Sequence, residues 1–123
     1  MHRVILETAS MTDLVETVGN AATLAIGMCD SDPDLVGAGM SDPVVTPERA
    51  RLITGYDDVR NAAFHAGAAG VTVSGAGPAI LAVCQDGDRR AVAAAMLGAF
   101  SDASIDARAY QTWIGQGSTV LSE

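Results

Sequence analysis

The feature that most constrains the fold is a pair of short apolar runs joined by a glycine turn. Residues 70–74 are Gly-Val-Thr-Val-Ser and residues 79–84 are Ala-Ile-Leu-Ala-Val-Cys, and short runs rich in β-branched residues are typical of strands. The four residues between them, Gly75-Ala76-Gly77-Pro78, indicate a tight turn. The sequence therefore predicts a β-hairpin in the second half of the chain.

The residues before this hairpin follow the period of an α-helix instead. Ser10 precedes Asp13 by three residues, in a pattern that resembles a capping box at a helix start. Apolar residues then recur every three or four positions, at Leu14, Val18, Ala21, Ala25 and Met28. This pattern predicts a helix over residues 12–28.

Further helices are predicted from their cap residues. Asp32-Pro33 is typical of the start of a short helix, and Thr46-Pro47-Glu48 repeats that signal for a helix that we expect to reach about residue 53. Asp57 and Asp58 favour a fourth helix start, because acidic side chains stabilise the first turn. Gly67 is a natural stop for that helix.

Two more elements are predicted after the hairpin. Helical spacing indicates a helix over residues 89–100, and strict alternation over residues 105–110 indicates a half-exposed strand. We expect a turn and a short extended piece over residues 115–121. Helices, a hairpin, a helix and a last strand define an α+β domain. It resembles a ferredoxin-like unit with its first strand absent or vestigial and its helices on one face of a small antiparallel sheet. Residues 1–123 fit one domain.

The charged residues are unusual in kind as well as in number. The net charge is −8, all seven basic residues are arginine, and eleven of the fifteen acidic residues are aspartate. Nucleic acid is not an expected partner, because a phosphate backbone requires a basic surface. An acidic surface without lysine suits a protein that works in concentrated salt, where the repulsion is screened. We interpret the chain as halophilic.

Location and the sulfur-containing residues carry less information. No apolar run approaches the roughly 20 residues of a membrane span, and the run at residues 4–6 is too short for a signal peptide. We therefore expect a cytoplasmic protein with no membrane partner.

Cys29 and Cys84 have no metal-binding spacing, and we interpret them as small buried residues. The same reasoning assigns four methionines to the core and predicts no metal site; these are Met11, Met28, Met40 and Met96.

The hairpin turn carries the first resemblance to a known family. Residues 71–80, V-T-V-S-G-A-G-P-A-I, resemble the third motif of GHMP kinases, in which a strand leads into a G-[SA]-G-P turn. Taken alone, a glycine turn between apolar strands is more often a plain hairpin. Successive N–H groups in such a turn can also bind an anion.

A second segment narrows the resemblance to homoserine kinases. Residues 42–56, D-P-V-V-T-P-E-R-A-R-L-I-T-G-Y, are similar to the D-x-x-x-x-P-x-R-x-x-L-I-P-x-[YF] stretch of that family. Pro47 and Arg49 fall at the proline and arginine of this pattern, and Thr54 replaces the second proline. Near the start, residues 2–7 match only the arginine, Arg3, and the leucine, Leu6, of the family pattern A-R-x-x-L-P.

The resemblance implies roles for these residues. In homoserine kinases, the arginines that match Arg49 and Arg3 hold the α-carboxylate of L-homoserine, and a guanidinium group is the preferred fork for a carboxylate. The residues that match Ser74, Gly75, Ala76 and Gly77 lie beside the phosphate loop of the nucleotide site. Ala76 stands where hydroxyl residues are common. Without the resemblance, a surface charge at a helix start is the commoner explanation of an arginine such as Arg49.

The resemblance also shows what the chain lacks. GHMP kinases bind ATP, with Mg²⁺, through the loop P-x-x-x-G-L-G-S-S-A-A of an N-terminal domain, and nothing similar occurs here. We therefore expect this chain alone to bind neither ATP nor Mg²⁺ and to be inactive, and we assign no catalytic residue. The parent enzyme would phosphorylate L-homoserine on the way to threonine.

Two alternative functions stay open. The oligomeric state also stays open, with a homodimer among the alternatives. One alternative function is another GHMP kinase, acting on mevalonate, shikimate or a similar alcohol. The other is a non-catalytic domain that binds an amino acid or a partner protein. Arg49 and Arg3 favour an acceptor with a carboxylate over an isoprenoid alcohol. The missing phosphate loop favours the non-catalytic alternative for the chain alone.

Overall fold

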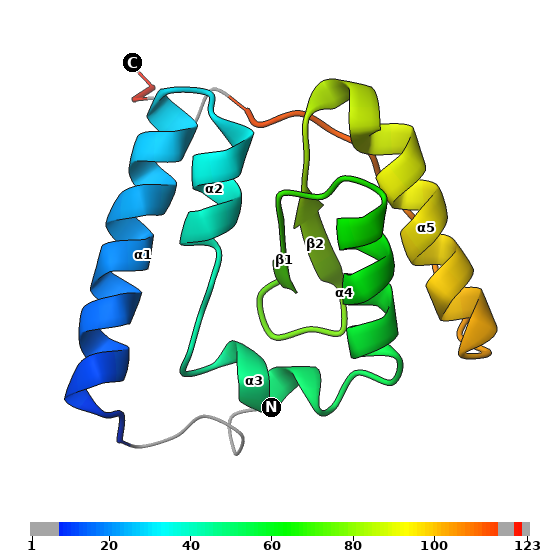
Figure 1. Cartoon of the computed structure of the whole chain (residues 1–123), viewed down its shortest axis with the longest axis horizontal. Coiled ribbons are helices and arrows are strands. Elements are labelled where there is room, and N and C mark those ends of the chain that lie inside the picture. The colour runs from blue at the N-terminus through cyan, green and yellow to red at the C-terminus, as the bar shows by residue number, and fades with distance from the viewer. Residues whose placement is uncertain (1–7, 116–119, 122–123) are drawn as a thin grey trace.

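The computed structural model describes residues 8–115, 120 and 121. Its elements are α1 (Met11–Cys29), α2 (Pro33–Gly39), α3 (Thr46–Ala50), α4 (Tyr56–His65), β1 (Gly70–Val73), β2 (Ile80–Val83), the 3-10 turn η2 (Asp86–Asp88) and α5 (Arg89–Asp102). The hairpin of β1 and β2 lies between the α1–α2 pair and the α4–α5 pair, and α3 lies close to the start of α4 (Figure 1). The α+β class predicted from the sequence is confirmed.

The helix starts follow the predicted cap residues. The Ser10 hydroxyl accepts the backbone N–H of Asp13 at 3.0 Å, and the Asp32 carboxylate accepts the N–H groups of Asp34 and Leu35. These bonds satisfy donors that a helix start leaves without partners. Gly67 follows the end of α4 with a φ of +113°, which favours glycine. Only α3 is clearly shorter than predicted, ending at Ala50 rather than near residue 53.

The hairpin forms with the register that its turn imposes. Strands β1 and β2 are antiparallel, with Val73 opposite Ile80 and Gly70 opposite Val83. Beyond the ladder, the N–H of Ser74 donates to the carbonyl of Ala79 at 2.8 Å and closes the end next to the turn. Two small clusters of buried side chains flank this hairpin: Ile53, Tyr56 and Val73 form one, and Ala63, Ala68 and Val92 form the other.

The strand predicted over residues 105–110 is wrong. The sheet of the described residues has two strands, and residues 105–110 belong to neither of them. Ile105 and Ala107 are nevertheless half-buried, whereas Asp106 and Arg108 are exposed. The alternation therefore reports which side of an extended segment faces the protein. It does not report a hydrogen-bonded neighbour, which a strand also requires.

The burial predicted along α1 is also wrong. Met11 is 73% exposed, Met28 is 47% exposed and Cys29 is exposed as well. The predicted apolar face follows the same trend, with Leu14 53% and Val18 64% exposed. Within the described residues, this face of α1 therefore has no cover.

Close backbone approach explains how α1 packs on α2 without its apolar stripe. A Cβ added at Gly27 would lie 2.6 Å from the backbone nitrogen of Val36, and one added at Gly39 would lie 2.4 Å from that of Leu24. Both distances are too short for a side chain, so the two helices meet glycine against backbone. No helix in the described part of the chain is long and apolar enough to cross a membrane.

Candidate functional site

Arg49 and the glycine turn, which are 26 positions apart in sequence, lie in contact. The Nη1 group of Arg49 donates a hydrogen bond to the carbonyl oxygen of Gly75 at 2.6 Å. Arg49 comes from the short helix α3, and Gly75 follows the end of β1. The structure thus brings together the two motifs that the sequence analysis singled out.

The turn itself requires its glycines. Gly75 and Gly77 have φ values of +57° and +83°, which L side chains rarely adopt. Ser74, Gly75 and Ala76 are exposed, and a Cβ added at Gly75 would meet no atom within 4 Å. Space is therefore open beside the turn, and a ligand group could approach its backbone.

Arg49 keeps donors that no described residue uses. Its Nε atom is shielded from solvent and has no hydrogen-bond partner in the described part of the chain. Two other arginines are engaged: Arg51 pairs with Glu48 at 3.3 Å, and Arg60 stacks on the ring of Phe64. A shielded guanidinium nitrogen without a partner is costly, and a guanidinium group is a suitable donor to a carboxylate or phosphate.

The start of α3 is held by one carboxylate. Asp42 accepts the backbone N–H groups of Val44, Val45 and Thr46 at 2.9, 3.0 and 3.0 Å, and the Thr46 hydroxyl at 3.0 Å. Burial by itself would raise the pKa of Asp42, but the hydrogen bonds from Val45, Val44 and Thr46 outweigh it and hold this pKa below its usual range. Asp42 is thus held ionised at neutral pH.

Thr46 continues this network to the hairpin. Its hydroxyl oxygen lies 3.4 Å from that of Thr72 in the middle of β1. Asp42 matches the first residue of the family pattern, but no role was predicted for it. A signal was present, because an aspartate often accepts the N–H groups of the residues that follow it.

The other predicted site residues have different outcomes. Arg3, the second arginine expected to bind the carboxylate, lies outside the described residues. Ser74 and Gly77 form the frame of the turn, since the N–H of Gly77 donates to the carbonyl of Ser74 at 3.0 Å. Ala76 offers no side-chain hydrogen bond at the apex.

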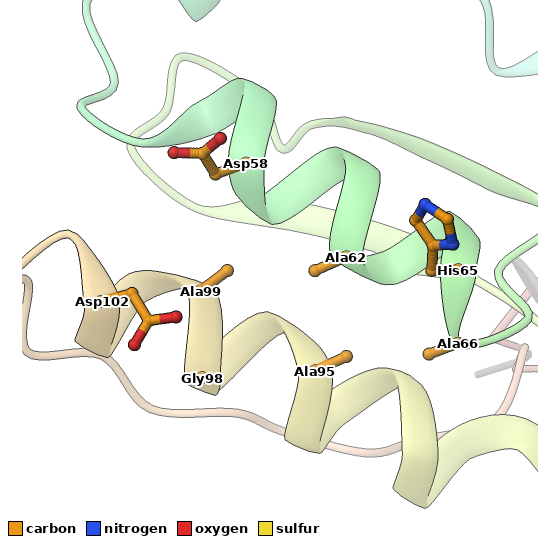
Figure 2. A pocket seen from close by; sticks show the side chains of 8 residues that line it. All are labelled: Asp58, Ala62, His65, Ala66, Ala95, Gly98, Ala99 and Asp102. Atoms are coloured by element: carbon orange, nitrogen blue, oxygen red, sulfur yellow. The ribbon is translucent and has the colours of Figure 1, made fainter.

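Two hollows lie away from the turn. One of about 680 Å³ separates α4 from α5 (Figure 2), where alanine and glycine face one another and Asp58, Asp102 and His65 lie at the edges. The other, about 640 Å³, lies among α2, α3, α4 and β1, with Asp42 and Thr46 in its wall. Neither is lined by Arg49 or by residues of the turn.

The described residues can also be compared with what a metal site or a reactive thiol requires. The described part of the chain contains no group of three or more His, Cys, Asp or Glu side chains that could hold a metal ion. Burial raises the pKa of the Cys84 thiol, and the charge of Asp88 acts in the same direction. A raised pKa makes a thiol less nucleophilic at neutral pH.

Comparison with known proteins identifies the class of this domain. The family described as GHMP kinases C terminal matches residues 19–102, and the chain belongs to this family. The match includes Asp42, Arg49 and the glycine turn.

Individual relatives are homoserine kinases. The chain is 86% identical over 122 residues to the homoserine kinase of Halorubrum lacusprofundi, covering 99% of this chain and 42% of that protein. It is 63% identical over 120 residues to that of Haloquadratum walsbyi, covering 98% and 41%. The chain thus spans about two fifths of the length of the curated relatives it matches. Such haloarchaeal relatives agree with the halophilic interpretation of the charges.

A solved structure is similar as well. The crystal structure of homoserine kinase from Cytophaga hutchinsonii matches with a TM-score of 0.77 and 33% sequence identity. The match covers 82% of this chain and 32% of that protein. The fold of the domain is therefore that of the C-terminal region of a GHMP kinase.

Proposed function

We propose that this chain supplies the acceptor-binding part of a homoserine kinase, which transfers the γ-phosphoryl group of ATP to L-homoserine and forms O-phospho-L-homoserine for threonine synthesis. Arg49 binds the α-carboxylate of homoserine, together with Arg3. An N-terminal ATP-binding domain completes the site, and the enzyme works in the cytoplasm.

One observation carries the acceptor assignment. Arg49 is fixed beside the glycine turn, yet its shielded Nε has no partner and no carboxylate of the described residues pairs with it. A planar guanidinium with free donors fits the two oxygens of a carboxylate. This favours an amino-acid acceptor over an isoprenoid alcohol.

This chain would supply only part of the nucleotide-binding site. The open side of the turn at Gly75 leaves room for a phosphate group beside backbone N–H donors. ATP and Mg²⁺ would supply the phosphoryl group and neutralise its charge, but the phosphate loop and the metal ligands must come from the N-terminal domain. The residues of this chain orient the acceptor and border the phosphates.

The test uses a chimaera in which this chain replaces the segment that it matches in the Halorubrum lacusprofundi enzyme. At 86% identity, this exchange changes few contacts. In molar KCl, the chimaeric kinase should release ADP when L-homoserine is added, and not when mevalonate or shikimate is added. Turnover with mevalonate or shikimate but not with homoserine would overturn the assignment. The chain alone should give no homoserine-dependent ADP release.

A further inference from the structure

Arg49 lies one helical turn after Val45, the N-cap residue of α3, and the backbone of Val45 is held by Asp42. The backbone N–H of Arg49 donates to the carbonyl of Val45 at 3.1 Å, and the N–H of Val45 donates to the Asp42 carboxylate. Two hydrogen bonds through a single residue, Val45, therefore connect Asp42 to the backbone of Arg49.

A second connection runs through the hairpin. Thr46, which Asp42 holds by both its N–H and its hydroxyl, lies 3.4 Å from Thr72 in β1. Three residues further along each segment, Arg49 meets Gly75 at 2.6 Å. In a helix, residues three apart lie on the same face. Helix α3 is therefore attached to β1 and its turn at two points, and Asp42 controls the first of them.

Helix α3 has few other means of holding this position. It contains only five residues, none of them fully buried, and its own N-cap residue, Val45, makes no side-chain cap hydrogen bond. Its apolar anchor is Ala50, which packs against the cluster of Ile53, Tyr56 and Val73. A helix this short is not stable by itself. Its placement depends on the bonds that Asp42 accepts.

We propose that Asp42 is a positioning residue for acceptor binding: its carboxylate fixes the first turn of α3 and thereby holds the Arg49 guanidinium beside the glycine turn. This inference rests on the proposed function of Arg49. Asp42 does not touch the acceptor. It acts through Arg49, and its loss leaves the guanidinium present but badly placed.

The experiment compares two Asp-to-Asn variants of the chimaeric kinase. Asp42→Asn keeps the side-chain shape but replaces one acceptor oxygen by an NH₂ group that cannot accept the bonds from Thr46. Asp32→Asn is the control, because Asp32 also accepts backbone N–H groups at a helix start, two of them on one oxygen, but leads to no arginine. We expect Asp42→Asn to raise the KM for homoserine about tenfold, which is less than the roughly hundredfold that a 1 Å misplacement can cost. The KM for ATP should stay within about twofold, as should both KM values in Asp32→Asn.

A double variant separates positioning from simple loss of stability. If Asp42 acts through Arg49, Asp42→Asn should add nothing to the homoserine KM in an Arg49→Ala background, because the group it positions is gone. Thr46→Val, which keeps Asp42 but removes one of its donors, should raise the homoserine KM in the same direction. Multiplicative effects of the two substitutions, or an unchanged homoserine KM in both Asp42→Asn and Thr46→Val, would overturn the proposal. The parent chimaera must turn over homoserine for this test, so failure of the proposed function shows there and not in the variants.

Discussion

The α1–α2 pair and the α3–hairpin region are held in place by different forces. The closest approaches between α1 and α2 are glycine against backbone, at Gly27 and Gly39, and a hydrogen bond joins Asn20 to Ser41. In the α3–hairpin region, Asp42 alone accepts four hydrogen bonds, and Arg49 reaches across to Gly75. The first region is held mainly by glycine packed against backbone, whereas the second is held mainly by polar side chains.

The difference matters for function. A glycine packed against the backbone of a neighbouring helix tolerates no added atom but places no chemical group. A polar network places individual donors and acceptors, and leaves one nitrogen of Arg49 without a partner. The α1–α2 pair is therefore expected to affect stability when altered, and the α3–hairpin region to affect ligand affinity.

Arg49→Ala in the chimaeric kinase should have the largest effect. A charge-assisted bond to a carboxylate contributes about 1.5–3 kcal/mol, so homoserine affinity should fall by roughly 10- to 150-fold. The unfolding free energy should fall only by the contribution of the single hydrogen bond to Gly75, about 1 kcal/mol. Arg49→Lys should recover only part of the affinity, since an ammonium group lacks the planar fork. The measurement is the KM for homoserine from steady-state kinetics. A KM of Arg49→Ala within twofold of that of the parent would contradict the role of Arg49 in binding the homoserine carboxylate.

Gly39→Ala should have the opposite profile. The added Cβ would lie 2.4 Å from the nitrogen of Leu24 and 2.6 Å from its Cα, and both are backbone atoms that cannot move aside alone. Forcing an extra carbon into a packed contact costs about 1–3 kcal/mol of unfolding free energy. The homoserine KM of the folded fraction should match that of the parent. A denaturant titration measures the loss, and an unchanged midpoint would show that the two helices are free to separate.

The parts of each region that could be predicted from the sequence are those that depend on local patterns, and the rest depend on distant contacts. The Ser10 cap, the Asp32 cap and the glycine turn were predicted because each depends on a local pattern of a few residues. The exposed face of α1 was not, because periodicity gives the spacing of apolar residues and not what covers them. The contact of Arg49 with Gly75 spans 26 positions, so only the family resemblance suggested that the two motifs belong together.

Salt should act mainly on the α1–α2 pair. Residues 8–41 carry five acidic residues and no arginine, lysine or histidine, whereas Arg49, Arg51 and Arg60 offset the acids around α3 and α4. Raising KCl from 0.1 M to molar levels shortens the Debye length from about 10 Å to about 3 Å. We expect about 1 kcal/mol more protection from hydrogen exchange in α1 and α2 of the chimaeric kinase, and less in α4. Equal gains in protection in the α1–α2 pair and in α4 would contradict the prediction that salt acts mainly on the α1–α2 pair.

Gly19→Ala gives a smaller effect, and of the opposite sign to Gly39→Ala. Gly19 lies inside α1, and a Cβ added there would meet no atom within 4 Å. Alanine favours an exposed helix interior over glycine by about 0.8–1 kcal/mol, so the unfolding free energy should rise by that amount or less. The same denaturant titration compares the two variants. A loss of stability in Gly19→Ala would mean that this face of α1 is covered closely in the intact enzyme.

Acid should weaken the α3–hairpin region by the smallest amount. The pKa of Asp42 is lower in the folded chain than in the unfolded one, where an aspartate titrates near 3.9. Its contribution to stability is therefore complete above that unfolded pKa and is lost as the pH falls through the folded pKa. The side chain is only partly buried, so solvent screening keeps this contribution below about 1 kcal/mol. The difference in unfolding free energy between the chimaeric kinase and its Asp42→Asn variant should stay constant above pH 5 and shrink below pH 4. A difference that persists unchanged to pH 3 would mean that the ionised carboxylate is not what holds the first turn of α3, and that the shape of the side chain is sufficient.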